Sequence, residues 1–450
     1  MSVAHKSMRL CPANRQHKVE LPLPNQAMSS ASHDMDSIMK NKIASGQSTI
    51  CSAACKEPRG AAMAPLISAV FIAFVAMGMA LPALPLHIHE RLGLTSLVVG
   101  LVVGSQFIAA IVFRVCAGRT ADGRGPKCAM IVGLLVAAAG GLVYLASLCV
   151  TGTPGLSAAI LLAGRALIGV AESFIIVGAQ SWGLAMLGTR NTSKVLAWVG
   201  SALFCAFAAG APLGSALYTH YGFAGVAIAT TALSLVTLAF IAPLKRLNPE
   251  QRARSGVLKV MAAVWLPGLG SALSSLGFGA LTAFSALLFV ARGWPSWTAF
   301  STFALAFIVT RVSISHVADR LGGAKVALVC VLIEAAGLSV IEFSRGLPLA
   351  LAGAALTGLG YSLVYPALGV EAVRRAPADS RGLAMGAYTA FLDVALGFGT
   401  PALGLLANSF GLGSAFLASA VAALCAAPIA AAMLRASTRA PGLHTALNTR

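Results

Sequence analysis

The chain has 450 residues, of which 58% are apolar and only 10% are charged. A soluble domain has roughly half apolar and about a quarter charged residues, so this composition indicates a membrane protein. Its 32 Lys and Arg residues outnumber its 14 Asp and Glu residues and give a formal net charge of +18. A nucleic-acid-binding protein is excluded, because the basic residues are spread over tails and short loops that meet lipid headgroups and do not share one soluble face.

Residues 1–60 differ in character from the rest of the chain. They contain eight basic residues, scattered serines and histidines, and no periodic pattern of apolar residues. This composition predicts a disordered cytoplasmic tail. A translation start near Met63 is the alternative that the composition leaves open, and the segment would then not be made.

Twelve apolar runs follow, each about long enough for a helix to cross roughly 30 Å of hydrocarbon at about 1.5 Å per residue. They do not alternate polar and apolar residues over about ten positions, so they predict helices and not barrel strands. The sequence therefore predicts an all-α membrane protein with twelve transmembrane helices, at 64–86, 95–116, 128–150, 156–182, 195–218, 223–244, 260–288, 297–317, 326–344, 347–370, 382–407 and 413–434.

The positions of Lys and Arg predict the orientation of these spans. If the N-terminus is cytoplasmic, only Arg91, Arg292 and Arg345 of the 32 basic residues fall in outward-facing loops. Basic residues concentrate on the cytoplasmic side of membrane proteins. Both termini are therefore expected in the cytoplasm, with the protein in the inner membrane of the cell.

A polar linker at 245–258 separates a first six-helix bundle, 61–244, from a second, 259–435, which a cytoplasmic tail at 436–450 follows. The two bundles resemble each other. "FRVCAGRTAD", from residue 113, aligns with "TRVSISHVAD", from residue 310, and superposes Arg114 on Arg311. "LAGRALIGVAES" (162–173) aligns with "LAGAALTGLGYS" (351–362) with seven of twelve residues identical. The bundles are therefore expected to be parallel repeats of one six-helix unit.

A charged segment, "GRTADGRGPK" (118–127), lies between the second and third spans and partly recurs as "SHVADRLGGAK" (315–325). With twelve spans and a central loop, this pattern resembles the major facilitator superfamily of secondary transporters over residues 62–435. The residues that match the family's signature are Gly118, Asp122, Gly125 and Lys127 in the first copy and Asp319, Arg320 and Gly322 in the second. "GLGYSLVYPALGVEAV" (358–373) and "AYTAFLDVALG" (387–397) resemble the bacterial YhhS/YfcJ branch, described as arabinose-efflux-like.

The resemblance implies a conformational latch at the signature residues. In the family, the aspartate that corresponds to Asp122 meets the N-terminal end of the eleventh helix and stabilises the outward-open form. Gly118 would let two helices approach closely. For the basic residues, including Lys127, the alternative is that they only determine topology.

Ionisable side chains at the membrane centre are costly and are candidates for function. Arg165 and Glu172 lie seven residues apart in the span 156–182, on one helix face about 10 Å apart. Asp393 lies in the span 382–407. Because their repeat mates, Ala354, Tyr361 and Phe204, are uncharged, we expect these residues to couple protons to transport, with Arg165 as the cation opposite an acid. A permanent structural ion pair is the alternative.

The expected substrate is a small molecule bound in a central cavity. Gln106, Tyr361 and Tyr388 are candidates to line it, although aromatic residues more often serve in packing. A sugar site would need several amides and aromatic rings, so a polar or anionic molecule held by Arg165 is as plausible as a pentose, and an amphipathic drug remains open.

The sequence therefore predicts a monomeric secondary transporter, not an enzyme, that exports a sugar, organic anion or drug by proton-coupled alternating access. It contains no metal-binding or nucleophile motif within the spans, so no cofactor is expected. Proton-coupled uptake by symport is the main alternative. A channel-like or non-transporting membrane protein is the other.

Overall fold

The structure, a computed structural model, describes residues 63–188, 192–244, 257–314, 321–375 and 381–438, and the statements below concern these residues. The predicted N-terminal tail lies outside them. The described elements are α2 (Ala64–Leu86), the short π-helix η2 (His87–Arg91), α3 (Ser96–Arg124), α4 (Pro126–Leu148), α5 (Pro154–Leu187), α6 (Thr192–Ile241), α7 (Val257–Ala291), α8 (Thr298–Ile314), α10 (Gly323–Phe343), α11 (Leu347–Arg375), α12 (Arg381–Phe410) and α13 (Gly413–Thr438).

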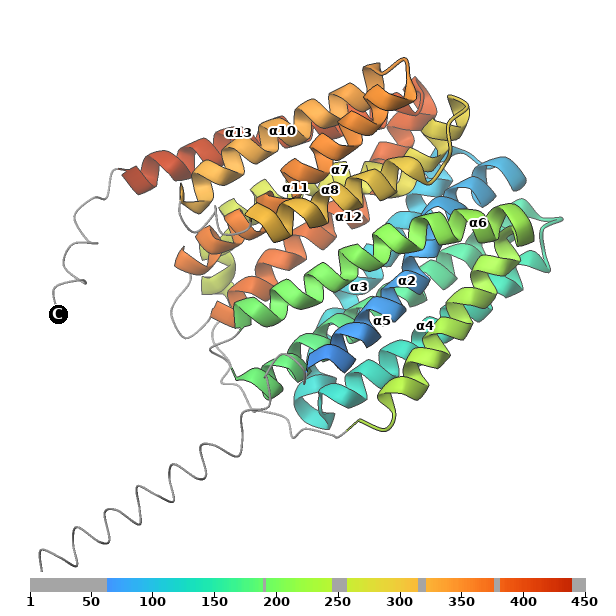
Figure 1. Cartoon of the computed structure of the whole chain (residues 1–450), viewed down its shortest axis with the longest axis horizontal. Helices are drawn as coiled ribbons and strands as arrows, with labels where there is room; N and C mark the ends of the chain where they lie inside the picture. Colours follow the sequence, from blue (N-terminus) through green and yellow to red (C-terminus); the bar gives the residue numbers. More distant parts are fainter. Residues whose placement is uncertain (1–62, 189–191, 245–256, 315–320, 376–380, 439–450) are drawn as a thin grey trace, which may run out of the picture. The chain divides into compact units, whose positions relative to one another are not determined.

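The long element α6 contains two membrane crossings. Its chain turns back at Gly222, where φ is 63° and ψ is −163°, in a region that glycine adopts without the clash of a Cβ. Figure 1 shows the two arms of α6 on either side of this turn. Ten described helices are long and apolar enough to cross a membrane, while α8 is a shorter apolar helix. Counting both arms of α6, the twelve predicted crossings are present.

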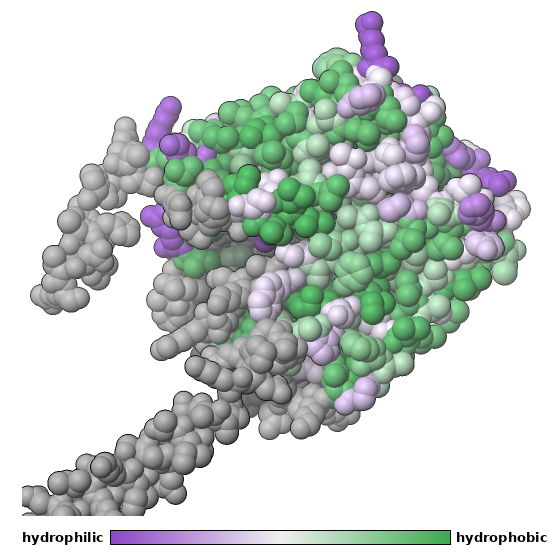
Figure 2. Space-filling model, in the orientation of Figure 1, coloured by the Kyte–Doolittle hydropathy of each residue, from purple (hydrophilic) through white to green (hydrophobic). Residues whose placement is uncertain are grey.

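The outer surface of the helices is apolar. Large side chains such as Val112, Val312 and Phe410 are more than half exposed. Figure 2 shows apolar residues over the sides of the helices and the strongly hydrophilic residues gathered near their ends. Such a surface is stable against lipid tails and costly in water, so the fold suits a bilayer.

Equivalent contacts recur in the two halves of the chain. In the first half, Gly169 of α5 lies so close to the α3 backbone at Gln106 that a Cβ there would overlap it. In the second half, Gly358 of α11 lies in the same way against the α8 backbone at Phe303. These residues are matched by the repeat alignment. The fold is therefore all-α, with two six-helix repeats.

A hydrogen bond recurs at the next turn of the same helices. Ser173 Oγ donates to the carbonyl oxygen of Ala110 at 2.7 Å, and Ser362 Oγ donates to that of Phe307 at 2.9 Å. The bond satisfies a serine hydroxyl inside the membrane, where water is absent. It fixes the register of α3 on α5 and of α8 on α11.

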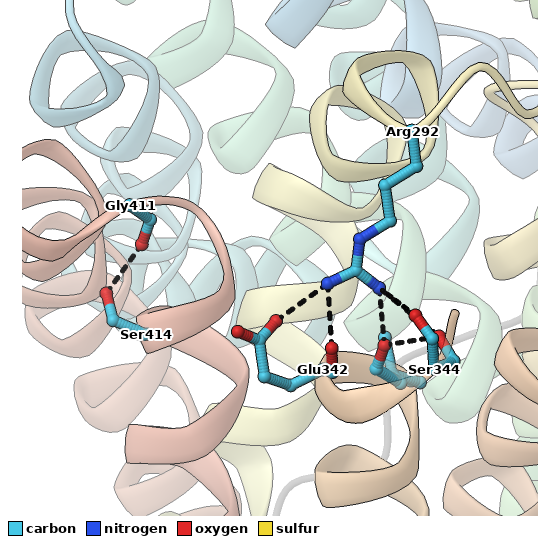
Figure 3. A network of polar contacts seen from close by, with 6 residues as sticks. Arg292, Glu342, Ser344, Gly411 and Ser414 are labelled. Carbon is cyan, nitrogen blue, oxygen red and sulfur yellow. Dashed lines mark hydrogen bonds and ion pairs between the residues drawn. The ribbon is translucent and has the colours of Figure 1, made fainter. Parts of the chain in front are cut away.

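We call the end of the bundle where α2 begins and α13 ends the proximal face, and the opposite end the distal face. On the distal face, Arg292 follows α7 and caps the C-terminal end of α10 (Figure 3). Its guanidinium donates to the carbonyl oxygens of Ile341 and Glu342, both at 2.8 Å, and to Glu342 Oε2 at 2.9 Å. A cation at this end of a helix satisfies unpaired carbonyls and the helix dipole. The cap holds α7 and α10 together.

The two halves cover each other at the distal face. Every residue of α2 from Ala73 to Leu86, and both residues that follow, are buried, as is every residue of α7 from Gly277 to Phe289. The proximal parts of these helices are less covered, since Phe71 and Trp265 are exposed. The structure is therefore closed at the distal face and more open at the proximal face.

Candidate functional site

The first acid of the candidate site is positioned by the tight packing of α5 on α3. Because Gly169 and Ser173 bring the two helices together, the side chain of Gln106 reaches Glu172. Gln106 Nε2 donates to Glu172 Oε2 at 2.5 Å. The structure thus joins two of the predicted site residues directly, one from each helix.

The second acid, Asp393, pairs with an arginine from the other half of the protein. Arg114 Nη2 of α3 lies 2.8 Å from Asp393 Oδ2 of α12, and the Asp393 side chain is only 6% exposed. The atoms are at ion-pair distance but are not aligned for a hydrogen bond, and Asp393 Oδ2 accepts none from the described residues. The pair is held by charge and crosses the interface between the halves.

The two acids belong to one electrostatic cluster. Glu172 interacts with Arg114 and Arg165, and Asp393 interacts with both Arg114 and Glu172. Charges in such a poorly solvated region act on one another more strongly than in water. A proton gained or lost by one acid therefore changes the protonation equilibrium of the other.

Arg165 of α5 is enclosed inside the first half. It is 2% exposed, and neither Nε nor Nη1 has a hydrogen-bond partner among the described residues. It interacts electrostatically with Tyr144 of α4 and with Glu172. The sequence predicted Arg165 as the cation opposite one of the two acids. In the structure Arg165 interacts with Glu172, and the cation that pairs with Asp393 is Arg114.

The predicted tyrosines contribute mainly to packing. Tyr388 is fully buried and donates a hydrogen bond of 2.8 Å to the carbonyl oxygen of Tyr365. Tyr365 Oη lies 2.7 Å from Thr389 Oγ1. Tyr361 is 4% exposed and stacks on Phe278 with 5.7 Å between ring centroids. None of these rings is free to stack on a substrate in this form.

An aromatic cluster closes the interface on the distal side of the acids. Phe204 of α6 and Phe307 of α8 stack across the two halves with ring centroids 3.7 Å apart. The cluster, called here the aromatic seal, consists of Phe204, Phe207, Phe278, Phe300, Phe303, Phe307 and Tyr361.

Arg311, the repeat mate of Arg114, lies beside this seal. Its guanidinium carbon lies 5.8 Å from the ring centroid of Phe307, and Nη1 donates to the carbonyl oxygen of Ser362 at 3.3 Å. No carboxylate of the described residues forms an ion pair with it. Arg114 and Arg311 occupy matching positions of the sequence repeat, but neither was predicted as a site residue.

The predicted latch residues that the structure describes make no hydrogen bond or ion pair between the two halves. No atom lies within 4 Å of a Cβ built on Gly118, so no close helix approach occurs there. Asp122 is exposed, and no hydrogen bond or ion pair reaches it from the described residues. Gly125 makes the turn between α3 and α4 with φ of 94°. Asp319 and Arg320 lie outside the described residues.

Lys127 has a structural role that the sequence did not predict. It is 8% exposed, and its Nζ donates to the carbonyl oxygens of Ala242 and Leu244, both at 2.6 Å. These carbonyls end the second arm of α6, where a cation satisfies unpaired acceptors. Lys127 therefore joins α4 to the end of α6 within the first half, and it is more than a topology determinant.

A further acid, Glu334 of α10, is enclosed in the second half. It is 0% exposed, and Glu334 Oε2 accepts a hydrogen bond of 2.5 Å from Ser274 Oγ of α7. The acid has no ion-pair partner among the described residues. It belongs to the packing of α7 on α10, apart from the Arg114 and Asp393 pair.

Comparison with known proteins identifies the family. The sequence matches the family model of the Major Facilitator Superfamily over residues 66–302 and 269–448. It is 41% identical over 369 residues to an uncharacterised MFS-type transporter of Salmonella typhimurium, covering 82% of this chain and 95% of the relative. An uncharacterised MFS-type transporter of Pseudomonas aeruginosa is 39% identical over 373 residues, with 83% of this chain and 92% of the relative covered.

Solved structures show the same fold. The human organic anion transporter MFSD10 (TETRAN) superposes with a TM-score of 0.63 at 17% identity, covering 83% of this chain and 100% of that one. The nucleoside transporter NupG superposes with a TM-score of 0.64 at 16% identity, covering 83% and 98%. The family match, the close relatives and the shared fold agree, and the chain therefore belongs to the major facilitator superfamily of membrane transporters.

Proposed function

We propose that this transporter couples the movement of a small molecule to protons by alternating access, as a monomer in the inner membrane with both termini in the cytoplasm. The observation that carries the proposal is the ion pair between Arg114 and Asp393. It joins α3 of one half to α12 of the other at 2.8 Å, with an acid that is almost fully buried.

This pair offers a direct link between a proton and the conformation. An ionised Asp393 attracts Arg114 and holds the two halves together at this level. A proton on Asp393 cancels its charge, and the attraction across the interface is lost. Glu172, which interacts electrostatically with both residues, is a second place at which a proton can be held. The balance between the two forms of the transporter would then depend on protonation.

The proximal-open conformation of the structure supports a latch role for Asp122. With cytoplasmic termini, the proximal opening faces inward. The resemblance implies that Asp122 stabilises the outward-open form, and here Asp122 is exposed and has no partner among the described residues. We therefore propose that Asp122 engages only when the proximal face closes and the aromatic seal opens.

Two directions of transport follow from proton coupling. Export in exchange for protons is the direction implied by the sequence resemblance to the efflux-like branch. Uptake by proton symport is favoured by one observation: the arginines in and beside the acid cluster, Arg114, Arg165 and Arg311, outnumber the acids Glu172 and Asp393. A surplus of positive charge suits an anionic substrate, and a proton that moves with the anion offsets its charge.

The test is a pH-driven transport assay in proteoliposomes that contain the full chain, with labelled sugars, organic anions and drugs as the panel. We expect Asp393→Asn to abolish accumulation driven by a pH gradient and to retain exchange of labelled for unlabelled substrate. Asp122→Asn serves as the matched control, because it removes a carboxylate outside the cluster and should slow both activities together. Accumulation that persists in Asp393→Asn would disprove the role of the pair.

A further inference from the structure

We propose that Arg311 binds the substrate and that the substrate is a small organic anion. This inference rests on the transport function proposed above and adds the chemical class of the cargo. It also assigns substrate binding to Arg311. The repeat alignment matched this residue with Arg114, but neither the sequence motifs nor the family resemblance predicted it as a site residue.

The internal repeat supplies a comparison between two equivalent arginines. Arg114 in the first half has an acid from the opposite half, Asp393, at ion-pair distance. The residue of the other half that matches Asp393 is Phe204. The position that supplies the carboxylate to Arg114 therefore holds an uncharged residue in the other half, and the guanidinium of Arg311 lies over the ring of Phe307.

The second acid near Arg114 is replaced in the same way. Glu172 of α5 interacts electrostatically with Arg114, and its repeat mate on α11 is Tyr361. Arg311 interacts with this tyrosine and with Tyr365. Neither of the two acids that neutralise Arg114 has an acidic counterpart beside Arg311. Arg311 therefore carries a positive charge without a protein counter-ion among the described residues.

The guanidinium of Arg311 has N–H donors that make no hydrogen bond with the described residues. Its one hydrogen bond with the described residues goes from Nη1 to the carbonyl oxygen of Ser362 at 3.3 Å. An arginine has five N–H donors arranged to meet a carboxylate or phosphonate with two parallel bonds. The unpaired nitrogens of Arg165 are sealed inside the first half, whereas the Arg311 side chain is only partly buried. Arg311 is therefore the arginine that an incoming anion can reach.

The surroundings of Arg311 favour an organic anion over an inorganic one. Phe307 lies under the guanidinium, and the seal with Phe204 and Tyr361 excludes water on the distal side. In such a poorly hydrated place a charge pair is stronger than in bulk water. The same apolar walls suit the body of a carboxylate or phosphonate that also carries an apolar group.

The anion site and the proton site are electrically linked. Tyr365 lies near Arg311 on one side and near both Arg114 and Asp393 on the other, so the two sites share one poorly hydrated region in which charges act on each other directly. An ionised Asp393 repels a bound anion, and a proton on Asp393 removes that repulsion. By reciprocity, the anion also favours protonation, so anion and proton would bind together and move in the same direction.

Thermal unfolding of the purified full chain in detergent tests the site directly. The probes are benzoate and phenylphosphonate, with uncharged benzamide and an equal ionic strength of chloride as controls. We expect both organic anions to raise the Tm in a concentration-dependent way, because a ligand that binds the folded state stabilises it. Benzamide and chloride should leave the Tm unchanged.

Variants identify the residue that is responsible. Arg311→Gln should weaken anion binding roughly 10- to 100-fold, the usual worth of charged hydrogen bonds. Arg311→Lys keeps the charge and should bind the anions with an affinity between those of the unchanged chain and Arg311→Gln. This variant keeps the site testable even if Arg311→Gln does not fold. Arg119→Gln removes an exposed arginine of α3 and should respond like the unchanged chain.

Two results would overturn the inference: no stabilisation of the unchanged chain by either anion, or equal stabilisation of Arg311→Gln. Failure of the proposed function looks different. In that case the anions would bind through Arg311, but Asp393→Asn would leave pH-driven accumulation unchanged. Conversely, pH-driven transport that depends on Asp393 but is insensitive to Arg311→Gln would keep the function and reject the anion site.

Discussion

Gly100 of α3 lies directly against the backbone of Thr400 in α12. A Cβ at Gly100 would sit 2.7 Å from the carbonyl oxygen of Thr400, and one at Gly104 would sit 2.8 Å from that of Gly397. Glycines allow two membrane helices to approach this closely. Because the helices belong to opposite halves, this contact is part of the distal closure.

A larger side chain at Gly100 should therefore open the distal face. Overpacking costs about 1–3 kcal/mol, so Gly100→Val should disfavour the distal-closed form at least roughly fivefold. The measurement is labelling of Phe204→Cys in the aromatic seal by a thiol reagent that cannot cross the membrane, in a background without native cysteines. Labelling from the distal side should become faster. Gly155→Val is the matched control, since no atom lies within 4 Å of a Cβ there, and equal labelling in both variants would contradict the prediction.

Lys127 should stabilise the first half through its two carbonyl partners. Lys127→Met removes hydrogen bonds of 2.6 Å to Ala242 and Leu244 and leaves both acceptors unpaired. The loss should be on the order of 2 kcal/mol, visible as a lower Tm of the purified chain. Arg124→Met, at an exposed position of the same turn, should unfold at the temperature of the unchanged chain. An equal Tm for both variants would mean that the cap does not contribute.

The fold could be predicted from the sequence because it depends on long-range patterns of composition. Twelve apolar runs and the matched glycines of the repeat define the helices and their pairing, and contacts such as Gly169 on Gln106 and Gly358 on Phe303 follow from that alignment. Helix ends were predicted less well. The second span was expected to end at 116, whereas α3 continues to Arg124, because a helix can carry charged residues out of the membrane.

That error explains why Arg114 was missed as a site residue. A span that ends at 116 places Arg114 at the membrane surface, but Arg114 lies ten residues before the end of α3. Its pairing with Asp393 depends on how the two halves pack, which no local pattern encodes. The capping role of Lys127 was also missed, because its bonds to Ala242 and Leu244 join segments more than a hundred residues apart. The alignment of Arg114 with Arg311 was the one available signal.

The orientation of the chain can be tested with reporters. A reporter inserted after Arg292, which caps α10 on the distal face, should be accessible from outside the cell. A reporter after Arg450 should be accessible only from inside, because basic residues are concentrated on the proximal side. Accessibility on the opposite sides would reverse the assignment of proximal as cytoplasmic, and with it the description of this form as inward-facing.

Asp122 is exposed in the proximal-open form. If Asp122 acts only when the proximal face is closed, Asp122→Asn should leave the Tm of the inward-facing form and substrate affinity unchanged. It should slow transport, because the outward-open form loses a stabilising contact at a helix N-terminus, worth about 0.3–1 kcal/mol when exposed and up to about 2 kcal/mol when partly buried. Initial rates in proteoliposomes at several substrate concentrations separate the maximal rate from the apparent affinity. Normal transport by Asp122→Asn, in preparations where Arg165→Ala is inactive, would show that Asp122 is a surface residue and that no latch operates there.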